Sequence, residues 1–453
     1  MWRGFVLSIK KWALPLTCTL IFSLVTGCTS EKAAPENGKA TAGPDSKKPV
    51  VIKLHSWYTN EREAINKAVD DFNAKNPGIK LEYEFLTENA PDAMKKLDLL
   101  AASGEQLDIF VLNSASSYTQ RIGMGMLEPL DDYMKKEGLN YNDEYMLDMK
   151  YNGKYYAIPG KYSAKLVLLN KEHLDEAGLP VPKEWTWDDY LEYARKLTKG
   201  EGTKKRYGGH FTNSIMNPVL SNQPQENGMY KKDGTPNVDN ARTRKSLDIM
   251  WKAEQVDKTA MPYADIIAQK LDARASFLNG DISMMFEGSW MVKESGGTAQ
   301  LPAKFKTVYA PYPKFSKDDP NGYTGVNGDF IAISSKSKHK EEAYKAARYL
   351  STEGLVLQGK EFPAWRKADT AKVADKIISN VAQPQFMDKE SLLHVLNTFK
   401  FSELDMPPSY NAEAQKTFNG EVEKFLLGVQ DANATISKST EALIKIAGAG
   451  KKQ

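Results

Sequence analysis

The sequence predicts an α/β protein with more than one domain, and two observations support this prediction. The chain has 453 residues, whereas single hydrophobic cores stop growing at about 250–300 residues. Between residues 50 and 112 the hydrophobic pattern alternates between strand and helix spacing, which is typical of a doubly wound parallel sheet. The composition, 41% hydrophobic and 26% charged, argues against a disordered chain and against a membrane protein with many spans.

The first 27 residues have the pattern of a bacterial signal peptide. Three basic residues precede an apolar run at 12–25 that is short for a membrane span. The run leads to Gly27-Cys28, which resembles the lipobox of bacterial lipoproteins, in which the cysteine becomes the lipid-modified first residue. The alternative is an ordinary secretory peptide with a cysteine there by chance. We expect lipidation of Cys28, and attachment to the extracytoplasmic face of the cell membrane.

The cysteine and charge counts argue against several classes of function. Cys18 lies within the expected signal peptide, so acylation of Cys28 would leave no thiol for a disulfide, a metal or a nucleophile. Loss of the three basic residues of segment 1–27, which contains no acid, leaves 58 basic and 58 acidic residues. This balance gives no electrostatic signature of nucleic-acid binding. Residues 28–49 lack large apolar side chains up to Pro49 and predict a flexible tether.

The first part of the predicted sheet provides two candidate ligand loops. Ligands of doubly wound sheets bind beyond the carboxyl ends of the strands. Trp57 and Tyr58 follow the first expected strand, and Asn113 and Ser114 follow the third. The alternative for Trp57 is that it packs beneath its own loop. The elements expected here are strands at 50–54, 79–85 and 107–112 and helices at 64–72 and 93–102.

The stretch from 151 to 190 contains several turn and cap signals. Asn152-Gly153 predicts a tight hairpin turn, because both residues tolerate positive φ. A short strand at 154–159 should end at Pro159-Gly160, and an apolar strand at 165–169 should be buried on both faces. Asn170 should cap the next helix, and Thr186 with Asp189 predicts a capping box.

The second half predicts further alternating elements. Ser289 is expected to cap a helix after the strand at 282–286. Gly325 to Asp329 precede an expected strand at 330–333. The C-terminal part should be helical with an apolar face, and 447–453 a frayed tail. The other expected helices lie at 187–198, 240–254, 265–278 and 337–350.

Three segments resemble the extracellular solute-binding proteins of bacterial ABC importers, and more closely the carbohydrate-binding cluster that includes maltose-binding protein. They are the pattern Asn-Gly-Lys-x-Tyr-Ala-x-Pro with the strand, helix and tryptophan loop after it, then 277–292 and 327–350. The resemblance implies a type II periplasmic-binding-protein-like fold, in which two lobes, each a doubly wound sheet flanked by helices, enclose a ligand cleft. The implied lobes are 50–160 with 283–334, and 161–282 with 335–453. The resemblance also implies that Gly325 to Asp329 form a glycine-rich turn before the strand at 330–333.

The resemblance implies a saccharide ligand, and the chain offers suitable side chains. A pyranose has an apolar face and a rim of hydroxyls, so its site needs aromatic planes beside polar groups. Trp290 follows a strand at the position where family members stack a tryptophan on sugar. The alternative is that several of the candidate aromatic residues pack the interior of the lobes and do not contact the ligand. The candidate ligand-binding residues are Trp57, Tyr58, Asn113, Ser114, Tyr162, Glu287, Trp290, Asn327, Asp329, Trp365 and Arg366.

No pattern in the sequence predicts catalysis. The five histidines lack metal-ligand spacing, and neither a Gly-x-Ser-x-Gly elbow nor a phosphate-binding Walker loop occurs. We therefore expect a monomeric receptor, without cofactor or metal, that delivers a sugar or oligosaccharide to ABC permease subunits. The alternative is a receptor of the same fold for a polyamine, an organic anion or a metal chelate.

Overall fold

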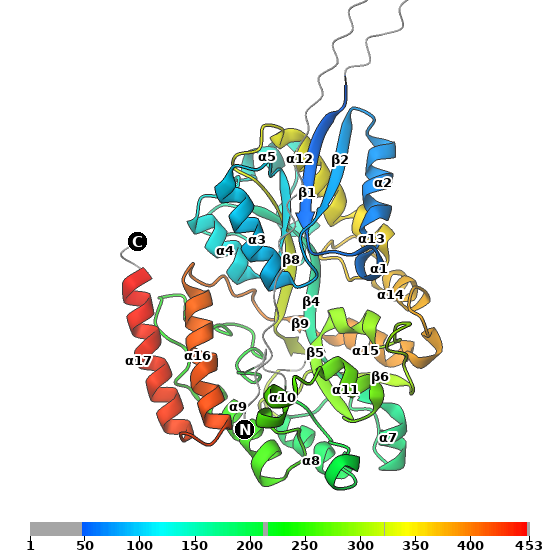
Figure 1. Ribbon diagram of the computed structural model, residues 1–453, viewed down its shortest axis with the longest axis vertical. Helices are drawn as coiled ribbons and strands as arrows, with labels where there is room; N and C mark the ends of the chain where they lie inside the picture. Colours follow the sequence, from blue (N-terminus) through cyan, green and yellow to red (C-terminus); the bar gives the residue numbers. More distant parts are fainter. Residues whose placement is uncertain (1–47, 212–215, 321, 451–453) are drawn as a thin grey trace, which may run out of the picture. The chain divides into compact units, whose positions relative to one another are not determined.

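A computed structural model of the chain describes residues 48–211, 216–320 and 322–450. The expected signal peptide, Cys28 and nearly all of the tether lie outside these residues. The described part is an α/β structure, as predicted (Figure 1). Within it no helix has the length and apolar character needed to cross a membrane.

One sheet of seven strands organises the described chain. The first three strands are β1 (Val50–Ser56), β2 (Ile79–Phe85) and β3 (Ile109–Leu112), and they pair in parallel as predicted. β8 (Val326–Ile333) joins antiparallel to β3, and β4 follows it, so the order is β2-β1-β3-β8-β4-β5. β6 also pairs with β4, and β7 (Tyr323–Thr324) with β9 (Lys400–Phe401) forms a small separate sheet.

Strand β4 (Ala157–Asn170) connects the two ends of this sheet. Two strands separated at Pro159-Gly160 were expected, but the structure has one strand of 14 residues. Its pairing with β8 shifts register between Pro159 and Tyr162, and a proline without an N–H group is tolerated at such a bulge. The far half of β4 pairs antiparallel with β5 (Met284–Gly288) and β6 (Thr307–Pro311).

The side chains of β4 enter two hydrophobic cores. Leu166 and Leu168 belong to the core around β1, β2 and β3, whereas Val167 and Leu169 belong to a second core with α8, α9, α16 and α17. Alternate residues of a strand point to opposite faces, so one apolar run serves both cores. This confirms that the expected strand at 165–169 is buried on both faces. Figure 1 shows β4 and β8 running between the part that holds β1 and β2 and the part that holds α8 and α9.

The helices cover the faces and ends of the sheet. The expected capping box of Thr186 and Asp189 is present, Asn170 caps α7, and Asn152 and Gly153 have φ of 49° and 81° in the expected turn. The helices are α1 Asn60–Glu63, α2 Ile65–Lys75, α3 Ala90–Ser103, α4 Ala115–Gly123, α5 Asp131–Glu137, α6 Tyr141–Glu144, α7 Lys171–Glu176, α8 Trp187–Leu197, α9 Ala241–Trp251, α10 Tyr263–Gln269, α11 Ala273–Asn279, α12 Lys340–Ser351, α13 Glu353–Gln358, α14 Thr370–Ser379, α15 Lys389–Thr398, α16 Asn411–Leu426 and α17 Ala432–Gly450.

Three local predictions were wrong. The helix expected at 265–278 is interrupted after α10, where Lys270 adopts a left-handed φ of 52°. The glycine-rich segment that begins at Gly325 enters β8 instead of forming a separate turn, because its backbone pairs with β4. α17 continues to Gly450, and Ala447 packs in the second core, so the expected fraying does not begin there.

The packing of α12 bears on where one lobe ends. This helix contacts α2, β1, β4 and β8, and α13 packs on α2. Both helices therefore lie on the side of the sheet that holds β1 and β2. The lobe boundary at 335 stays a prediction, and this packing favours a later return of the chain to the second lobe.

Candidate functional site: a polar cleft beside the long strand

A central cavity of about 390 Å³ lies beside β4, β5 and β8. Four of the residues expected from the sequence line it: Ser114, Glu287, Trp290 and Asn327. The remaining polar walls are mostly hydroxyls and amides, with Lys165 and Asp405 as the other charged residues. Those hydroxyl and amide side chains belong to Ser116, Ser163, Ser221, Asn227, Asn411 and Gln415.

The pairing of β4 with β5 fixes the positions of two charged groups in this cavity. Lys165 lies opposite Gly288, and Leu166 lies opposite Glu287, so the lysine and the carboxylate come from neighbouring strands. Lys165 Nζ donates to Ser221 Oγ at 2.7 Å. Among the residues that the structure describes, Glu287 accepts one hydrogen bond, from the N–H of Gly288 at 3.3 Å. Its carboxyl group therefore keeps most of its hydrogen-bonding capacity for a ligand.

Burial changes the protonation of the same groups. It raises the pKa of Glu287 to about 7 and lowers the pKa of Lys165 to about 8. Burial, and after it the nearby charge of Glu403, raises the pKa of Asp405 to about 6. A carboxyl group that is partly protonated near neutral pH both donates and accepts hydrogen bonds, as the hydroxyls of a sugar do.

Local geometry also positions Trp290. The indole follows β5 in the short 3₁₀ helix η3 (Ser289–Glu294), whose cap is Gly288. Ser289 was expected to be the cap, but its oxygen instead accepts from the N–H of Ala164 at 3.2 Å. A Cβ atom at Gly288 would lie 2.7 Å from Cδ1 of Trp290, so glycine leaves the space that the indole occupies.

Two further cavities adjoin the central one. A cavity of about 650 Å³ shares Glu287 and Trp290 with it. A cavity of about 790 Å³ shares Asn227, Leu404, Asp405 and Pro407, and its own walls include three tyrosines. These three cavities, which share lining residues, make up the groove, and Trp290 lines two of them.

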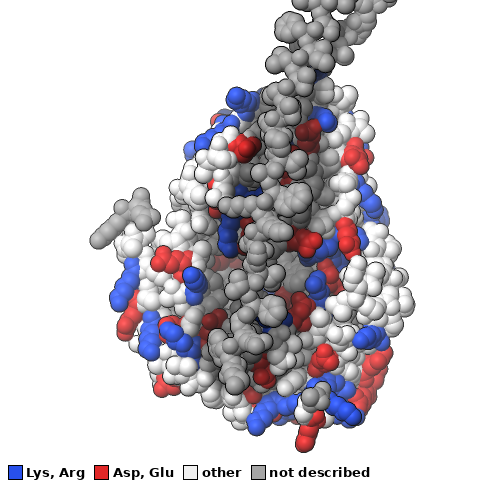
Figure 2. Space-filling view, viewed as in Figure 1, with Lys and Arg blue, Asp and Glu red and all other residues white. Residues whose placement is uncertain are grey.

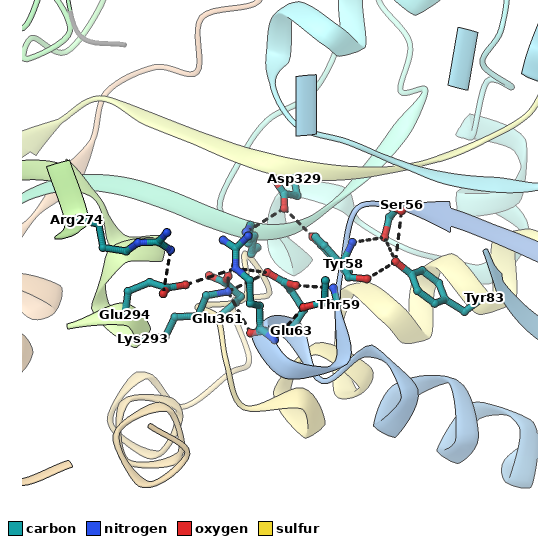
Figure 3. Close-up of polar contacts among 12 residues, drawn as sticks. Ser56, Tyr58, Thr59, Glu63, Tyr83, Arg274, Lys293, Glu294, Asp329 and Glu361 are labelled. Carbon is teal, nitrogen blue, oxygen red and sulfur yellow. Dashed lines mark hydrogen bonds and ion pairs between the residues drawn. The ribbon is translucent and has the colours of Figure 1, made fainter. Parts of the chain in front are cut away.

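Tyr58 and Asp329 lie elsewhere, in a buried network of ion pairs. Tyr58 Oη donates to Asp329 Oδ2 at 2.7 Å, and Lys161 Nζ is 3.0 Å from the same oxygen. Lys161 also contacts Glu361 at 3.1 Å. Burial acts to lower the pKa of Lys161, but the two carboxylates raise it above its ordinary value. Figure 3 shows Tyr58 and Asp329 facing one another within this network.

The network extends through Lys293, which contacts Glu361 at 2.5 Å and Glu63 at 3.1 Å. Burial raises the pKa of Asp329, whereas Lys161 and Lys293 outweigh burial at Glu361 and lower its pKa. Opposite charges in such a network compensate one another, so none of them is left buried without a partner. Tyr58 and Asp329 are thus engaged by protein groups and are not among the residues that line the central cavity.

The remaining candidates also lie outside the lining of the central cavity. Trp57 is buried against Tyr58, with ring centroids 5.2 Å apart, so the packing alternative describes its position. Tyr162 is buried beside Phe401, with ring centroids 5.0 Å apart. Asn113 Oδ1 accepts from the hydroxyl of Ser117 at 2.5 Å.

Trp365 and Arg366 contact the segment around α6. Trp365 is half-buried, and its Nε1 donates to Glu144 at 2.8 Å. Arg366 is exposed, and its Nε donates to the carbonyls of Asn142 and Tyr145 at 2.8 Å each. No cluster of histidine, cysteine, aspartate and glutamate suited to a metal occurs among the residues that the structure describes.

Sequence reasoning missed Lys165 and Asp405. Lys165 begins an apolar run, and the run was interpreted only as a buried strand. Asp405 lies in a loop and Asn411 begins α16, and neither residue follows a strand that was predicted from the sequence. The only sequence signal between these two residues was the Pro407-Pro408 pair, which marks a loop without indicating a site.

Comparisons with known proteins identify the family and the fold of this chain. A sequence model described as bacterial extracellular solute-binding protein matches residues 57–355. The multiple sugar-binding protein of Streptococcus mutans is 24% identical over 346 residues, which cover 72% of this chain and 77% of that protein.

Two solved structures share the fold. An ABC substrate-binding protein from Listeria monocytogenes, in complex with cycloalternan, superposes with a TM-score of 0.72 at 22% identity, over 89% of this chain and 100% of that one. A Mycobacterium tuberculosis protein in complex with glycerophosphocholine gives 0.71 at 17% identity, over 89% and 99%. The match of the family model to most of the chain identifies it as a member of the bacterial extracellular solute-binding proteins.

Proposed function

We propose that this protein is the receptor of an ABC importer, and that it captures a sugar or oligosaccharide in the cleft for delivery to a membrane permease. The observation that carries the proposal is the lining of the central cavity. Trp290 offers an aromatic face, and hydroxyl, amide and carboxyl groups surround it. This is the combination that the apolar face and hydroxyl rim of a pyranose require.

The comparisons support the same ligand class. The Streptococcus mutans relative is named a multiple sugar-binding protein, and the Listeria protein was solved with a cyclic oligosaccharide. The glycerophosphocholine complex keeps the alternative of a non-sugar solute open, because that protein has the same fold.

A thermal-shift screen of the mature protein tests the proposal against the alternative. The panel contains neutral mono- and oligosaccharides, polyamines and organic anions. A ligand at a hundred times its dissociation constant stabilises the native state by about 2.7 kcal/mol. Each kcal/mol moves the melting temperature of a protein this large by about 2 °C. Stabilisation by a saccharide supports the proposal, whereas stabilisation by polyamines or anions with none by any saccharide contradicts it.

The proposed membrane attachment depends on Cys28. A single acyl chain binds membranes weakly, but two chains hold a protein firmly. We therefore expect Cys28→Ala to release the protein from the membrane, while Cys18→Ala leaves it attached. Fractionation of cells that express each variant measures this, and a Cys28→Ala protein that still pellets with membranes after a salt wash would contradict the anchor.

A further inference from the structure

The 650 Å³ cavity beside Trp290 differs in charge from the central cavity. Three cationic residues line it, namely Arg62 of α1, Lys270 and Arg274 of α11. Arg62 follows β1 and Arg274 precedes β5, so residues far apart in the sequence line the same cavity. His210 also lines the cavity, but burial lowers its pKa to about 4, so it is neutral at pH 7.

The cations of this cavity are only partly matched by protein carboxylates. Arg62 Nε lies 3.5 Å from Glu294 and 4.0 Å from the buried Glu63, and Arg274 Nη1 donates to Glu294 at 3.3 Å, so the two guanidinium groups share Glu294. Figure 3 shows Arg274 beside Glu294. Arg274 Nε also lies 3.8 Å from the exposed Asp272.

Several donors in the cavity remain available. Among the described residues, none accepts from the terminal nitrogens of Arg62 or from Nη2 of Arg274, and the side chain of Lys270 has no ion-pair or hydrogen-bond partner. Two carboxyl groups also line the cavity, those of Asp272 and Glu287, and Glu287 is shared with the central cavity. The remainder of the wall includes the apolar side chains of Ile266, Leu271, Met285 and Met291. Lys270 is exposed, and the side chains of Arg62 and Arg274 are 39% and 38% exposed, so a ligand can reach these cations from solvent. Their N–H groups can form charge-assisted hydrogen bonds with an anion.

We propose that this cavity is an anion-binding subsite, and that the preferred ligand is a saccharide carrying a carboxylate or a phosphate. The inference rests on the proposed function, because the sugar ring would contact Trp290 while its acidic group reaches Arg62, Lys270 and Arg274. Guanidinium groups bind both kinds of anion through paired N–H donors. A uronate and a sugar phosphate supply the same chemistry, so the experiment separates them.

Calorimetric titration of the mature protein with matched ligands tests the subsite. The probes are cellobiose and maltose, their counterparts with a terminal glucuronate, the methyl esters of those uronates, and the corresponding 6-phosphates. The methyl ester has nearly the shape of the uronate without its charge. We expect at least one acid to bind tenfold or more tightly than its uncharged partner, with an advantage that falls as salt concentration rises.

Charge-removing variants locate the effect. Lys270→Gln with Arg274→Gln should reduce the advantage of the acid to threefold or less, and should leave the affinity for the uncharged partner within about twofold. Lys258→Gln is the matched control, because Lys258 is also exposed with a φ of 52° but does not line this cavity. A preference for uronate alone or for phosphate alone identifies the source of the anion.

The results also separate this inference from the proposed function. Uncharged saccharides that bind as tightly as their acidic partners, or an acid preference unchanged in the double variant, would overturn the subsite and leave the sugar receptor intact. Failure of every saccharide to bind would overturn both. Tight binding of inorganic phosphate or citrate alone, without any gain from the sugar, would also overturn the inference, in favour of an organic-anion receptor.

Discussion

Trp290 is the residue on which the ligand site depends most. Its half-buried indole lines two cavities at once, so a ligand in either one contacts it. Aromatic anchors of this kind typically contribute about 2 kcal/mol or more to binding. We therefore expect Trp290→Ala to weaken binding of the saccharide found in the screen by about thirtyfold or more, measured by calorimetric titration.

Trp365 provides a matched control for that prediction. It is also a half-buried tryptophan, but its Nε1 donates to Glu144 and it does not line the central cavity. Trp365→Ala should cost about 1–3 kcal/mol of stability through the lost bond and packing, and should leave affinity nearly unchanged. Near-wild-type affinity of Trp290→Ala together with a large drop in melting temperature would show that Trp290 is a packing residue.

Glu287 gives the protein a pH-dependent term in its stability. Burial raises the pKa of Glu287 from the ordinary 4.5 to about 7, so between these values the native state holds a proton that the unfolded state has released. Stability from this group is therefore present below pH 4.5 and is lost as pH rises through about 7. Glu287→Gln is neutral throughout, so its stability relative to wild type should increase by up to about 3 kcal/mol between pH 5 and pH 8.

Urea denaturation of wild type and Glu287→Gln at the two pH values measures this change. Other buried acids, such as Glu254 and Asp405, titrate in both proteins and cancel in the comparison. A stability difference that is the same at pH 5 and pH 8 would mean that the carboxyl group is ionised in the native state at both.

The sequence identified some site residues and not others for a physical reason. Ser114 and Trp290 follow the ends of β3 and β5, Glu287 is the last residue but one of β5, and both strands were recognisable from their apolar runs. The partners of Tyr58 and Asp329 could not be recognised, because those two residues are 271 positions apart and their ion network forms only in the folded chain. A polar residue near a strand end therefore predicted proximity to the cleft, but not whether another protein group already binds it.

Among the secondary-structure elements, the pairing of β4 with β8 is a feature that local sequence rules did not predict. Asn152, Thr186 and Asn170 were predicted correctly because turns and caps depend on neighbouring residues. Pro159-Gly160 was predicted to end a strand, yet pairing with β8, more than 160 residues later, carries the strand through a bulge. A partner so distant in sequence leaves no local signal.

The junction of β4 with β8 is also packed tightly enough to test. A Cβ atom at Gly328 would lie 2.6 Å from the carbonyl oxygen of Lys161 and 3.0 Å from the ring of Phe330. Backbone atoms within a paired strand cannot move aside easily, so Gly328→Ala should destabilise the protein by about 1–3 kcal/mol. Denaturant unfolding measures the change.

Gly420 is the control for this substitution. It lies inside α16, with nothing within 4 Å of the position of a Cβ atom. Gly420→Ala should therefore stabilise the protein by about 0.5–1 kcal/mol, because alanine loses less conformational entropy in a helix. Equal effects of the two substitutions would contradict the close packing between β4 and β8.

At the scale of the whole described chain, two hydrophobic cores are joined by one continuous sheet. The sequence predicted more than one folding unit from length alone, but not that a single strand, β4, would contribute side chains to both cores. Charged side chains of both signs are interspersed over the described part of the face in Figure 2. Long-range electrostatic attraction is therefore a weaker explanation of ligand capture than the short-range contacts of the groove.

The last prediction concerns closure of the groove around its ligand. The central cavity is lined by residues of α4 and β8, which pack in the first core, and by Asn411 and Gln415 of α16, which packs in the second core, so a bound sugar would bridge elements of both cores. A ligand that contacts both sides favours the closed arrangement by its extra contacts there. We expect the radius of gyration from small-angle scattering to fall when the saccharide found in the screen is added to saturation.

Trp290→Ala at the same sugar concentration is the control, because it should remain largely unliganded and keep the larger radius. This comparison separates closure from any general effect of the sugar solution on scattering. An unchanged radius of wild type at a saturation confirmed by calorimetry would mean that the groove is already closed without ligand, and binding would then have to proceed through a minor open population.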